Sequence, residues 1–334
     1  MSWKNTAQHS FADAMLVKHK CLNELDDVHK IINWQRITKM LKNLYSARVG
    51  APAYPPLVLF KALLLQAWYD LSDEALEKQL ARDLMFRKFI NLSITEPVPD
   101  HSTLWRFRNL LHKKKLLTPM LDEINNHLAR KSIIVTSGSI DIVDATVIEA
   151  KQSRPKKGKD GNNTQDKEAA YNVKTGSDGK RKTTYGYKLH CNTDEDGFIK
   201  KTTFTKGSTH DSQELDKLMT KKSTGVYADS AYASKKNKEK LKDRYKILNR
   251  KYRNKPLTKQ EKQQNKQITS IRYVVERTFG LLKLHMGLGK ARYMGINRNH
   301  TRAQLIAMAH NIKSGIRIYQ DMQRLKLQPV PIYV

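Results

Sequence analysis

SIDIVDATVI, residues 139–148, is the segment on which the expected fold of the second half of the chain depends. It is rich in β-branched residues, which favour strands, so we predict a central strand here. Two carboxylates lie in it, Asp141 and Asp144. Because successive side chains of a strand point to opposite faces of a sheet, these two residues face opposite ways. Only one of them can therefore belong to a given site.

The segments that follow alternate between strand and helix patterns. Further strands are expected over residues 185–191, 199–205, 225–229 and 245–248, and helices over 210–219, 235–241, around Glu276 and around 305–312. Three strands in a meander, followed by alternating helices and strands, predict a mixed sheet with helices packed on it. The expected fold class is therefore α/β, in the element order of a ribonuclease-H-like fold with flanking helices.

The N-terminal half predicts helices instead. Pro55-Pro56 opens a segment of apolar residues at helical spacing, a second helix is expected after Ser72, and Asp100 or Ser102 is expected to cap a third. The apolar positions are Leu57, Phe60, Leu64 and Trp68, then Leu76, Leu80 and Leu84, then Leu104, Phe107 and Leu111. We expect an all-α N-terminal DNA-binding domain over residues 1–132, after a lead-in with one or two short helices.

The third of these helices carries Arg106 and Arg108 at its edges. Two helices, a break and a basic helix are typical of a helix-turn-helix-like DNA contact. An ordinary helical bundle with a solvated basic face is the alternative, and the sequence leaves this choice open. Trp34, Trp68 and Trp105 are expected in the core.

The charge balance favours a polyanionic partner. The 334 residues include 62 Lys and Arg against 32 Asp and Glu, a net charge of +30. Such an excess attracts nucleic acid. An anionic membrane is the competing partner, but the basic residues are spread through folded-looking segments rather than one amphipathic helix. The most apolar run, residues 57–68, is interrupted by Lys61 and Gln66 and is too short to span a bilayer.

The two cysteines, Cys21 and Cys191, are far apart in the sequence. They predict neither a disulfide framework nor a zinc site. We expect a soluble, cytoplasmic protein, associated with the nucleoid, and no membrane partner.

A late helical segment brings charged residues onto one face. At about 100° per residue, Arg272, Glu276 and Lys283 fall within roughly 40° of one another. A carboxylate between two cations is a plausible anchor for a metal ion and a phosphate backbone. A salt-bridged surface is the simpler alternative.

Glu276 is one of three carboxylates that the expected strand order can bring together. Asp144 lies on the first strand and Asp229 ends the fourth, so the two emerge close together if these strands are neighbours. Oxygen ligands of this kind suit Mg²⁺, or Mn²⁺ as a substitute. Taken singly, each aspartate could simply cap a turn, and Glu276 could pair with Arg272.

Several blocks of sequence, in order, resemble one family. They are residues 55–89, 100–108, Asp144-Ala145-Thr146, 185–190, 228–232, the set of Arg272, Glu276 and Lys283, and 311–313. Together they resemble a bacterial insertion-sequence DDE transposase of the insertion-sequence-five group, over nearly the whole chain. The resemblance implies that Asp144, Asp229 and Glu276 are the catalytic metal ligands. It also implies that Arg272 and Lys283 contact DNA phosphates.

Some details depart from the family or are weaker. The family's tyrosine, three residues before the arginine, falls on Thr269, and Tyr273 is not a positional substitute because it points elsewhere on the helix. Lys188 could touch phosphate, although a solvated sheet lysine is the alternative. For His190, His210 and Asp211 we favour a structural role over a catalytic one.

The resemblance sets the expected domains and activity. A catalytic domain is expected over residues 133–320, with a basic loop at 151–184 and a basic insert at 249–270, followed by a tail at 321–334. We expect binding of double-stranded DNA at the terminal inverted repeats, cleavage and strand transfer by a homodimer assembled on DNA. The alternatives are a catalytically silent DNA-binding derivative, or a metal-dependent nuclease on the same fold that cuts without joining.

Overall fold

The computed structural model describes residues 19–45, 52–135, 139–152, 158–159, 166–175, 179–221, 223–251 and 256–327. Residues 153–157, 160–165 and 176–178 of the basic loop expected at 151–184 lie outside these ranges, as do residues 1–18 of the lead-in and 328–334 of the tail. The chain divides into two compact units, one of residues 1–134 and 305–334 and one of residues 135–304. No helix in the described ranges is long and apolar enough to cross a membrane.

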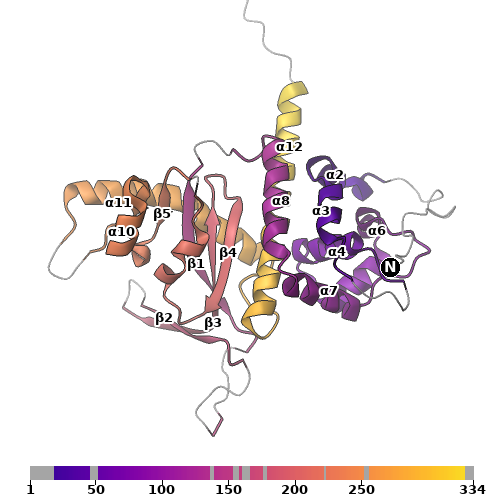
Figure 1. The fold of residues 1–334 in the computed structure, drawn as a ribbon, viewed down its shortest axis with the longest axis horizontal. Helices are drawn as coiled ribbons and strands as arrows, with labels where there is room; N and C mark the ends of the chain where they lie inside the picture. The colour runs from indigo at the N-terminus through magenta and orange to yellow at the C-terminus, as the bar shows by residue number, and fades with distance from the viewer. Residues whose placement is uncertain are drawn as a thin grey trace, which may run out of the picture. The chain divides into compact units, whose positions relative to one another are not determined.

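Among the described residues, the named elements of the first unit are all helices (Figure 1). Its elements are η1 (Lys20–Asn23), α2 (Asp26–Ile31), α3 (Trp34–Leu41), α4 (Pro56–Trp68), α5 (Asp73–Arg82), α6 (Leu84–Ile90), α7 (His101–Lys113) and α8 (Leu117–Arg130). Proline at the first turn opens α4, and the side chain of Ser72 caps α5, as the sequence predicts. Of the two candidates for the cap of α7, Asp100 and Ser102, the structure selects Asp100. Leu84 does not continue α5, because Asp83 ends that helix and its side chain caps α6.

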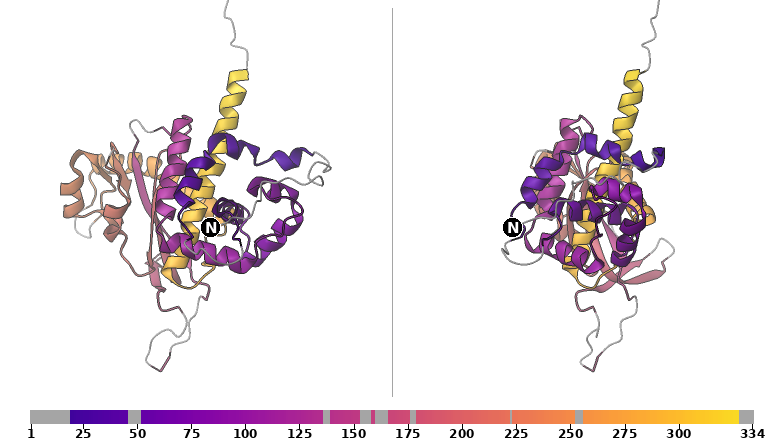
Figure 2. Two further views of the ribbon diagram at one scale, coloured as in Figure 1. Left: turned by 45° about the vertical axis from the view of Figure 1, so that its right-hand side comes forward. Right: turned by 90° about the vertical axis from the view of Figure 1, so that its right-hand side faces the viewer.

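The last helix, α12 (Ile296–Leu327), is one continuous helix, drawn in yellow in Figures 1 and 2. Its part from Leu305 onward belongs to the first unit. There the Trp68 indole N–H donates to the Ala309 carbonyl at 2.6 Å, and Asn311 donates to Asn125 at 2.7 Å. The expected boundaries at 133–320 and 321–334 therefore differ from the structure: the catalytic unit ends at about residue 304, and helix continues through the start of the expected tail.

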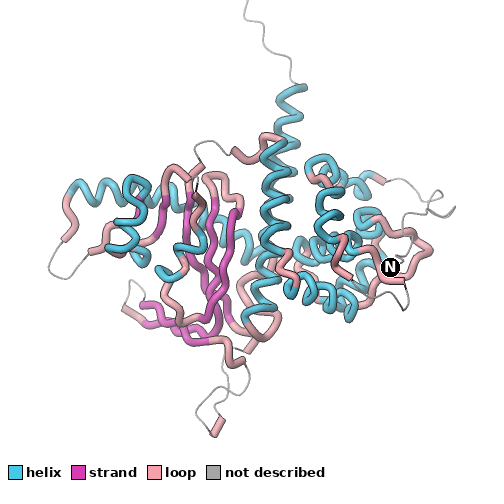
Figure 3. The backbone as a smooth tube through the Cα atoms, in the orientation of Figure 1, coloured by secondary structure: helices cyan, strands magenta, loops and turns pink. Residues whose placement is uncertain are grey.

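The second unit contains a six-stranded mixed sheet, whose strands are drawn in magenta in Figure 3. The strands are β1 (Asp141–Glu149), β2 (Ala170–Thr175), β3 (Arg181–Thr193), β4 (Ile199–Lys206), β5 (Val226–Ala228) and β6 (Tyr245–Ile247). Their order is β2-β3-β1-β5-β6, with β4 also on β3. Pairs among β1 to β4 are antiparallel, whereas β5 pairs parallel to β1 and β6 parallel to β5. The predicted mixed sheet is confirmed.

The expected loop at 151–184 is wrong where β2 and the start of β3 lie. Ala170–Thr175 pairs with Arg181–Gly186, and the rings of Tyr171 and Tyr185 pack across the pair at 4.9 Å. The loop was expected from the Lys/Gly/Asn-rich composition of residues 151–163. Cross-strand pairing decides the structure of β2 and the start of β3 instead, because strand preference depends on the neighbours available for packing.

Helices flank the sheet. On one side, α9 (Leu215–Leu218) and α10 (Lys235–Leu241) pack on Val143, Val226 and Ala228. The helix expected over 210–219 is shorter, because a 3-10 turn, η2 (Asp211–Gln213), precedes it; two further 3-10 turns are η3 (Ser230–Tyr232) and η4 (Lys242–Arg244). The long helix α11 (Lys259–His285) packs on β1 and β5 through apolar positions that include Val275, Phe279 and Leu282.

The basic insert expected at 249–270 is mostly the beginning of α11. Thr258 and Glu261 form a reciprocal capping box, in which each side chain accepts the backbone N–H of the other residue. This start signal nucleates a helix of 27 residues. Lys259, Lys262 and Lys266 of this segment therefore lie on a helix.

One test compares two glycines of the second unit. A Cβ at Gly186 would overlap the backbone oxygen of Ile148 and lie 2.9 Å from Ala150 N, whereas a Cβ at Gly280 in α11 meets open space. Gly186→Ala should lower the free energy of unfolding by about 1–3 kcal/mol or more, because backbone atoms cannot yield. Gly280→Ala should raise it by about 0.5–1 kcal/mol. Urea denaturation measures both; equal effects would contradict the close approach at Gly186.

A second test concerns the lysine inside α4. Lys61 is buried, donates to the Phe89 carbonyl at 3.0 Å and lies over the Trp34 ring. Burial lowers its pKa from 10.5 to about 8. Between these values the unfolded chain binds the proton and the folded chain does not, so stability should rise with pH from about 8 to 10.5. Denaturation of wild type and Lys61→Met should show this rise in wild type alone; parallel curves would contradict it.

Candidate active site

The strands carrying Asp144 and Asp229 are neighbours in the sheet. The parallel register pairs Val143 with Ala228, so the next residues, Asp144 within β1 and Asp229 directly after β5, lie at the same level of the sheet. Neighbouring strands lie about 4.8 Å apart. Each aspartate also accepts the N–H of the residue that follows it, which holds its carboxylate close to the backbone.

Helix α11 adds two charged side chains to this edge. A guanidinium nitrogen of Arg272, Nη2, lies 3.1 Å from Asp144 Oδ2 and 3.7 Å from Glu276 Oε1. Arg272 is buried, whereas the Glu276 side chain is 54% exposed. The two helix residues are one turn apart, so a single turn of α11 places a cation between carboxylates from two elements.

The carboxylates influence one another electrostatically. Burial raises the pKa of Asp144 to about 6; Arg272 and the Ala145 N–H oppose this rise, whereas the charges of Asp229 and Glu276 add to it. Carboxylates that repel in this way are stabilised by a cation, and in this structure Arg272 supplies part of that charge.

The donor set suits a hard divalent cation. Carboxylate oxygens are the ligands that Mg²⁺ and Mn²⁺ prefer, and here they come from Asp144, Asp229 and Glu276. Among the described residues, no three acidic, histidine or cysteine side chains are gathered as in a formed metal site. The side chain of Asp144 forms its ion pair with Arg272 at 3.1 Å.

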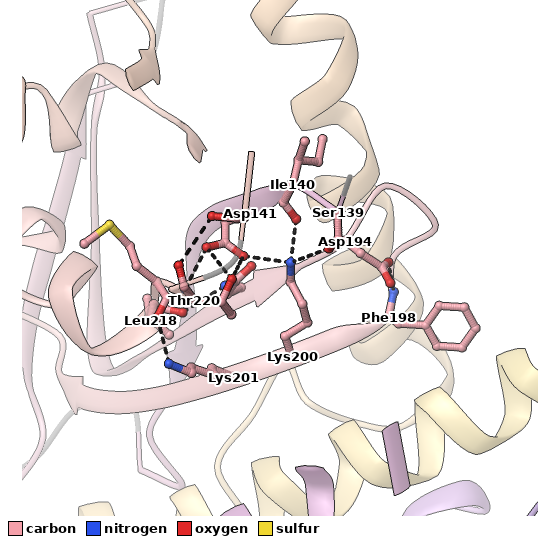
Figure 4. A network of polar contacts seen from close by, with 12 residues as sticks. Ser139, Ile140, Asp141, Asp194, Phe198, Lys200, Lys201, Leu218 and Thr220 are labelled. Carbon is pink, nitrogen blue, oxygen red and sulfur yellow. Dashed lines mark hydrogen bonds and ion pairs between the residues drawn. The ribbon is translucent and has the colours of Figure 1, made fainter. Parts of the chain in front are cut away.

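Asp141, the competitor of Asp144, faces the other side of the sheet and is fully engaged there (Figure 4). It forms an ion pair with Lys200 at 2.7 Å and accepts from the backbone N–H and the hydroxyl of Thr220 at 2.7 and 3.0 Å. These contacts hold its pKa below the usual value despite complete burial. The alternation predicted from the sequence separates a structural aspartate from one at the α11 face.

The structure does not bring Lys188 to this site. The antiparallel register pairs Asp144 with Cys191 and Val147 with Lys188, which places Lys188 on the opposite face of the sheet. Its ammonium group pairs with Asp211 at 2.9 Å and donates to the Thr209 carbonyl at 2.8 Å. Both alternatives for Lys188, phosphate contact and solvated lysine, are therefore replaced by a buried ion pair.

The histidines near the family blocks hold local structure. His190 is buried, with Nε2 2.9 Å from the Thr205 hydroxyl. His210 caps η2 by accepting from the Ser212 N–H. Among the described residues, neither imidazole forms a hydrogen bond with Asp144, Asp229 or Glu276.

Lys283 lies two turns beyond Glu276 on α11 and is exposed. Partial burial lowers its pKa, and the charges of Lys174 and Lys182 lower it further. Those two lysines stand on β2 and β3 and were missed in the sequence, because they fell inside the expected loop.

Thr269, at the position of the family's tyrosine, donates its hydroxyl to the Asn265 carbonyl of its own helix. Tyr273 is 62% exposed. The helix therefore presents a tyrosine ring to solvent one residue after Arg272, as the helical spacing predicts.

In the helical unit, the structure separates the two arginines of α7. Arg108 is buried, and its guanidinium makes a two-point ion pair with Asp73 at 2.7 and 2.8 Å, so its expected role in DNA contact is wrong. Arg106 points outward and donates to the Ser102 hydroxyl. Trp105 beside it is 42% exposed, which corrects its expected core position, whereas Trp68 is buried and Trp34 half-buried.

A mixed sheet that carries aspartates on two adjacent strands, with a glutamate on a helix across them, defines the class of enzymes that cut and join nucleic-acid strands on a ribonuclease-H-like fold. The family described as Transposase DDE domain matches residues 135–312, more than half of the chain. The chain belongs to this family of metal-dependent enzymes, which cleave and transfer DNA strands. Residues 14–110 match the family described as Transposase domain (DUF772). No solved structure matches the chain.

The contrast within α7 gives a test. Arg108→Ala should lower the free energy of unfolding by about 3 kcal/mol, because it leaves the partly buried Asp73 carboxylate without its guanidinium. Arg106→Ala, the same change on the outer face, should alter it by less than about 0.5 kcal/mol. Chemical denaturation compares the two, and similar losses would contradict a structural role confined to Arg108.

Proposed function

We propose that this transposase binds the terminal inverted repeats of an insertion sequence, cleaves their ends in a Mg²⁺-dependent reaction and joins the 3′-hydroxyls to target DNA. The observation that carries the proposal is the meeting of Asp144 with Arg272 and Glu276 at the edge where Asp229 emerges. Membership of the insertion-sequence-five group stays a prediction.

The carboxylates have the metal-binding role in this proposal. Asp144, Asp229 and Glu276 hold Mg²⁺, or Mn²⁺ in its place. The bound ion supplies activation of the attacking water or 3′-hydroxyl and stabilisation of the leaving oxygen. Asp144 and Asp229 are fixed by the strand register and by backbone N–H groups, so the sheet orients two of the three ligands.

The cations position the DNA. A DNA phosphate must lie next to the negatively charged carboxylates, and Arg272 offsets part of their charge. The buried Nε of Arg272 has no hydrogen-bond partner among the described residues. Lys283, two turns further along α11, contacts the backbone of the same DNA. From the helical unit, we retain Arg106 of α7 as a DNA contact, with the exposed Trp105 beside it.

Strand transfer requires two ends to be held together, so we propose a homodimer assembled on DNA, acting at the nucleoid. Two alternatives remain. A silent DNA-binding derivative would bind the repeats without cutting, and a nuclease on the same fold would cut without joining.

The test incubates purified protein with Mg²⁺ and DNA that carries the element's ends or a scrambled sequence. Asp144→Asn and Glu276→Gln should each lower end cleavage by more than about 100-fold, because losing residues that merely orient metal ligands already costs about 10–100-fold. The exposed Glu239→Gln on α10, a chemically identical change to Glu276→Gln, should leave cleavage unchanged.

Gel analysis of nicked and joined products separates the alternatives. Binding without cleavage would support the silent derivative, and cleavage without joining would support the nuclease. Full cleavage by either carboxylate variant would refute the metal assignment.

A further inference from the structure

Two lysines face each other across the β2–β3 hairpin. The antiparallel register pairs Lys174 directly with Lys182, so both side chains extend from the same face of the hairpin. Like charges in directly opposed positions destabilise a strand pair. Both lysines are exposed, and neither forms an ion pair with an acidic residue in the described ranges. The fold therefore maintains a local repulsion that an anion would relieve.

Lys283 at the end of α11 extends this pair to a cluster of three. It is exposed, lies close enough to Lys174 and Lys182 for their charges to lower its pKa, and has no ion pair with a described acidic residue. Helix α11 packs on β3, and Glu149, which pairs with Gly186 of β3, donates its N–H to the Gly289 carbonyl just beyond the helix, so the helix end lies near the start of β3. We name Lys174, Lys182 and Lys283 the hairpin cluster.

Four other lysines of the same unit, in contrast, are paired with acidic residues. Lys188, Lys200, Lys217 and Lys240 each form an ion pair, with Asp211, Asp141, Glu214 and Asp216 respectively, at 2.7–2.9 Å. In each of these four cases the unit supplies a carboxylate to the lysine, and Lys201 donates instead to the Met219 carbonyl. The hairpin cluster has three ammonium groups and no such carboxylate among the described residues.

We infer that the β2–β3 hairpin is a DNA-binding element, in which Lys174 and Lys182 bind backbone phosphates next to the one held at Lys283. This inference rests on the proposed function of the carboxylate site. Lys283 lies seven residues after Glu276, about 10 Å along the helix at 1.5 Å per residue. The hairpin therefore holds DNA that continues past the carboxylates, and it grips this DNA through its backbone rather than its sequence.

The test measures binding of duplex DNA without divalent ions at several salt concentrations. Each phosphate contact contributes about 0.9 to the slope of log K against log salt. Lys174→Gln/Lys182→Gln should therefore make this slope less negative by about 2. The matched control, Lys30→Gln/Lys240→Gln, removes the same charge from two exposed lysines already paired with Asp27 and Asp216, and should change the slope by much less.

Two further results decide the inference. Lys174→Arg/Lys182→Arg should restore the wild-type slope, because arginine keeps the charge; failure to restore it, with an unchanged melting temperature, would overturn the inference. A slope for the glutamine variant equal to that of the control would also overturn it.

The assay contains no metal, so the hairpin is tested separately from catalysis. If wild type cuts and joins ends but the glutamine variant keeps the wild-type slope, only the hairpin inference fails. If the slope changes as expected but no ends are cut, the proposed function fails and the hairpin inference stands.

Discussion

The parallel pairing of β1 with β5 is the constraint on which the rest of the second unit depends. It sets Asp144 beside Asp229 and, on the other face, packs Val143 against the short helices. The same pairing gives α11 a surface to cross, which allows Arg272 to reach Asp144. A strand moved by one residue would turn every side chain to the opposite face, so the site and the core are fixed by one register.

Charge is managed differently on the two faces of this sheet. On the α9 and α10 side, Asp141 and Asp211 are matched by lysines at hydrogen-bond distance. On the α11 side, acids outnumber the single buried guanidinium, and Asp144 has a raised pKa. Further along α11 positive charge predominates instead, because Lys283 lies near Lys174 and Lys182 and none of the three pairs with a described acidic residue. An acid-rich position followed by a base-rich one along a single helix suits a metal and a polyanion held side by side.

Much of this arrangement follows from local sequence signals. Strand composition predicted β1, alternation separated Asp141 from Asp144, and capping residues such as Ser72 and Asp100 marked helix starts. What failed depended on contacts with another segment of the chain. Arg108 was expected at the surface, but it is buried and paired with Asp73. Residues 170–175 were expected in a loop, because the stability of β2 comes from its pairing with β3. The Gly-Ser-Asp-Gly segment at 176–179 was the one local signal for that hairpin.

Because β1 lies between an antiparallel neighbour and a parallel one, it is held by hydrogen bonds along both edges. Asp144 thus belongs to the part of the unit that opens last, since central strands exchange their amide hydrogens only when the whole unit unfolds. Glu276 and the lysines lie on a helix and a hairpin at the periphery, which can adjust without breaking the sheet. Accommodation of DNA of varying shape thus falls to these peripheral elements, while the aspartates provide a stationary reference point.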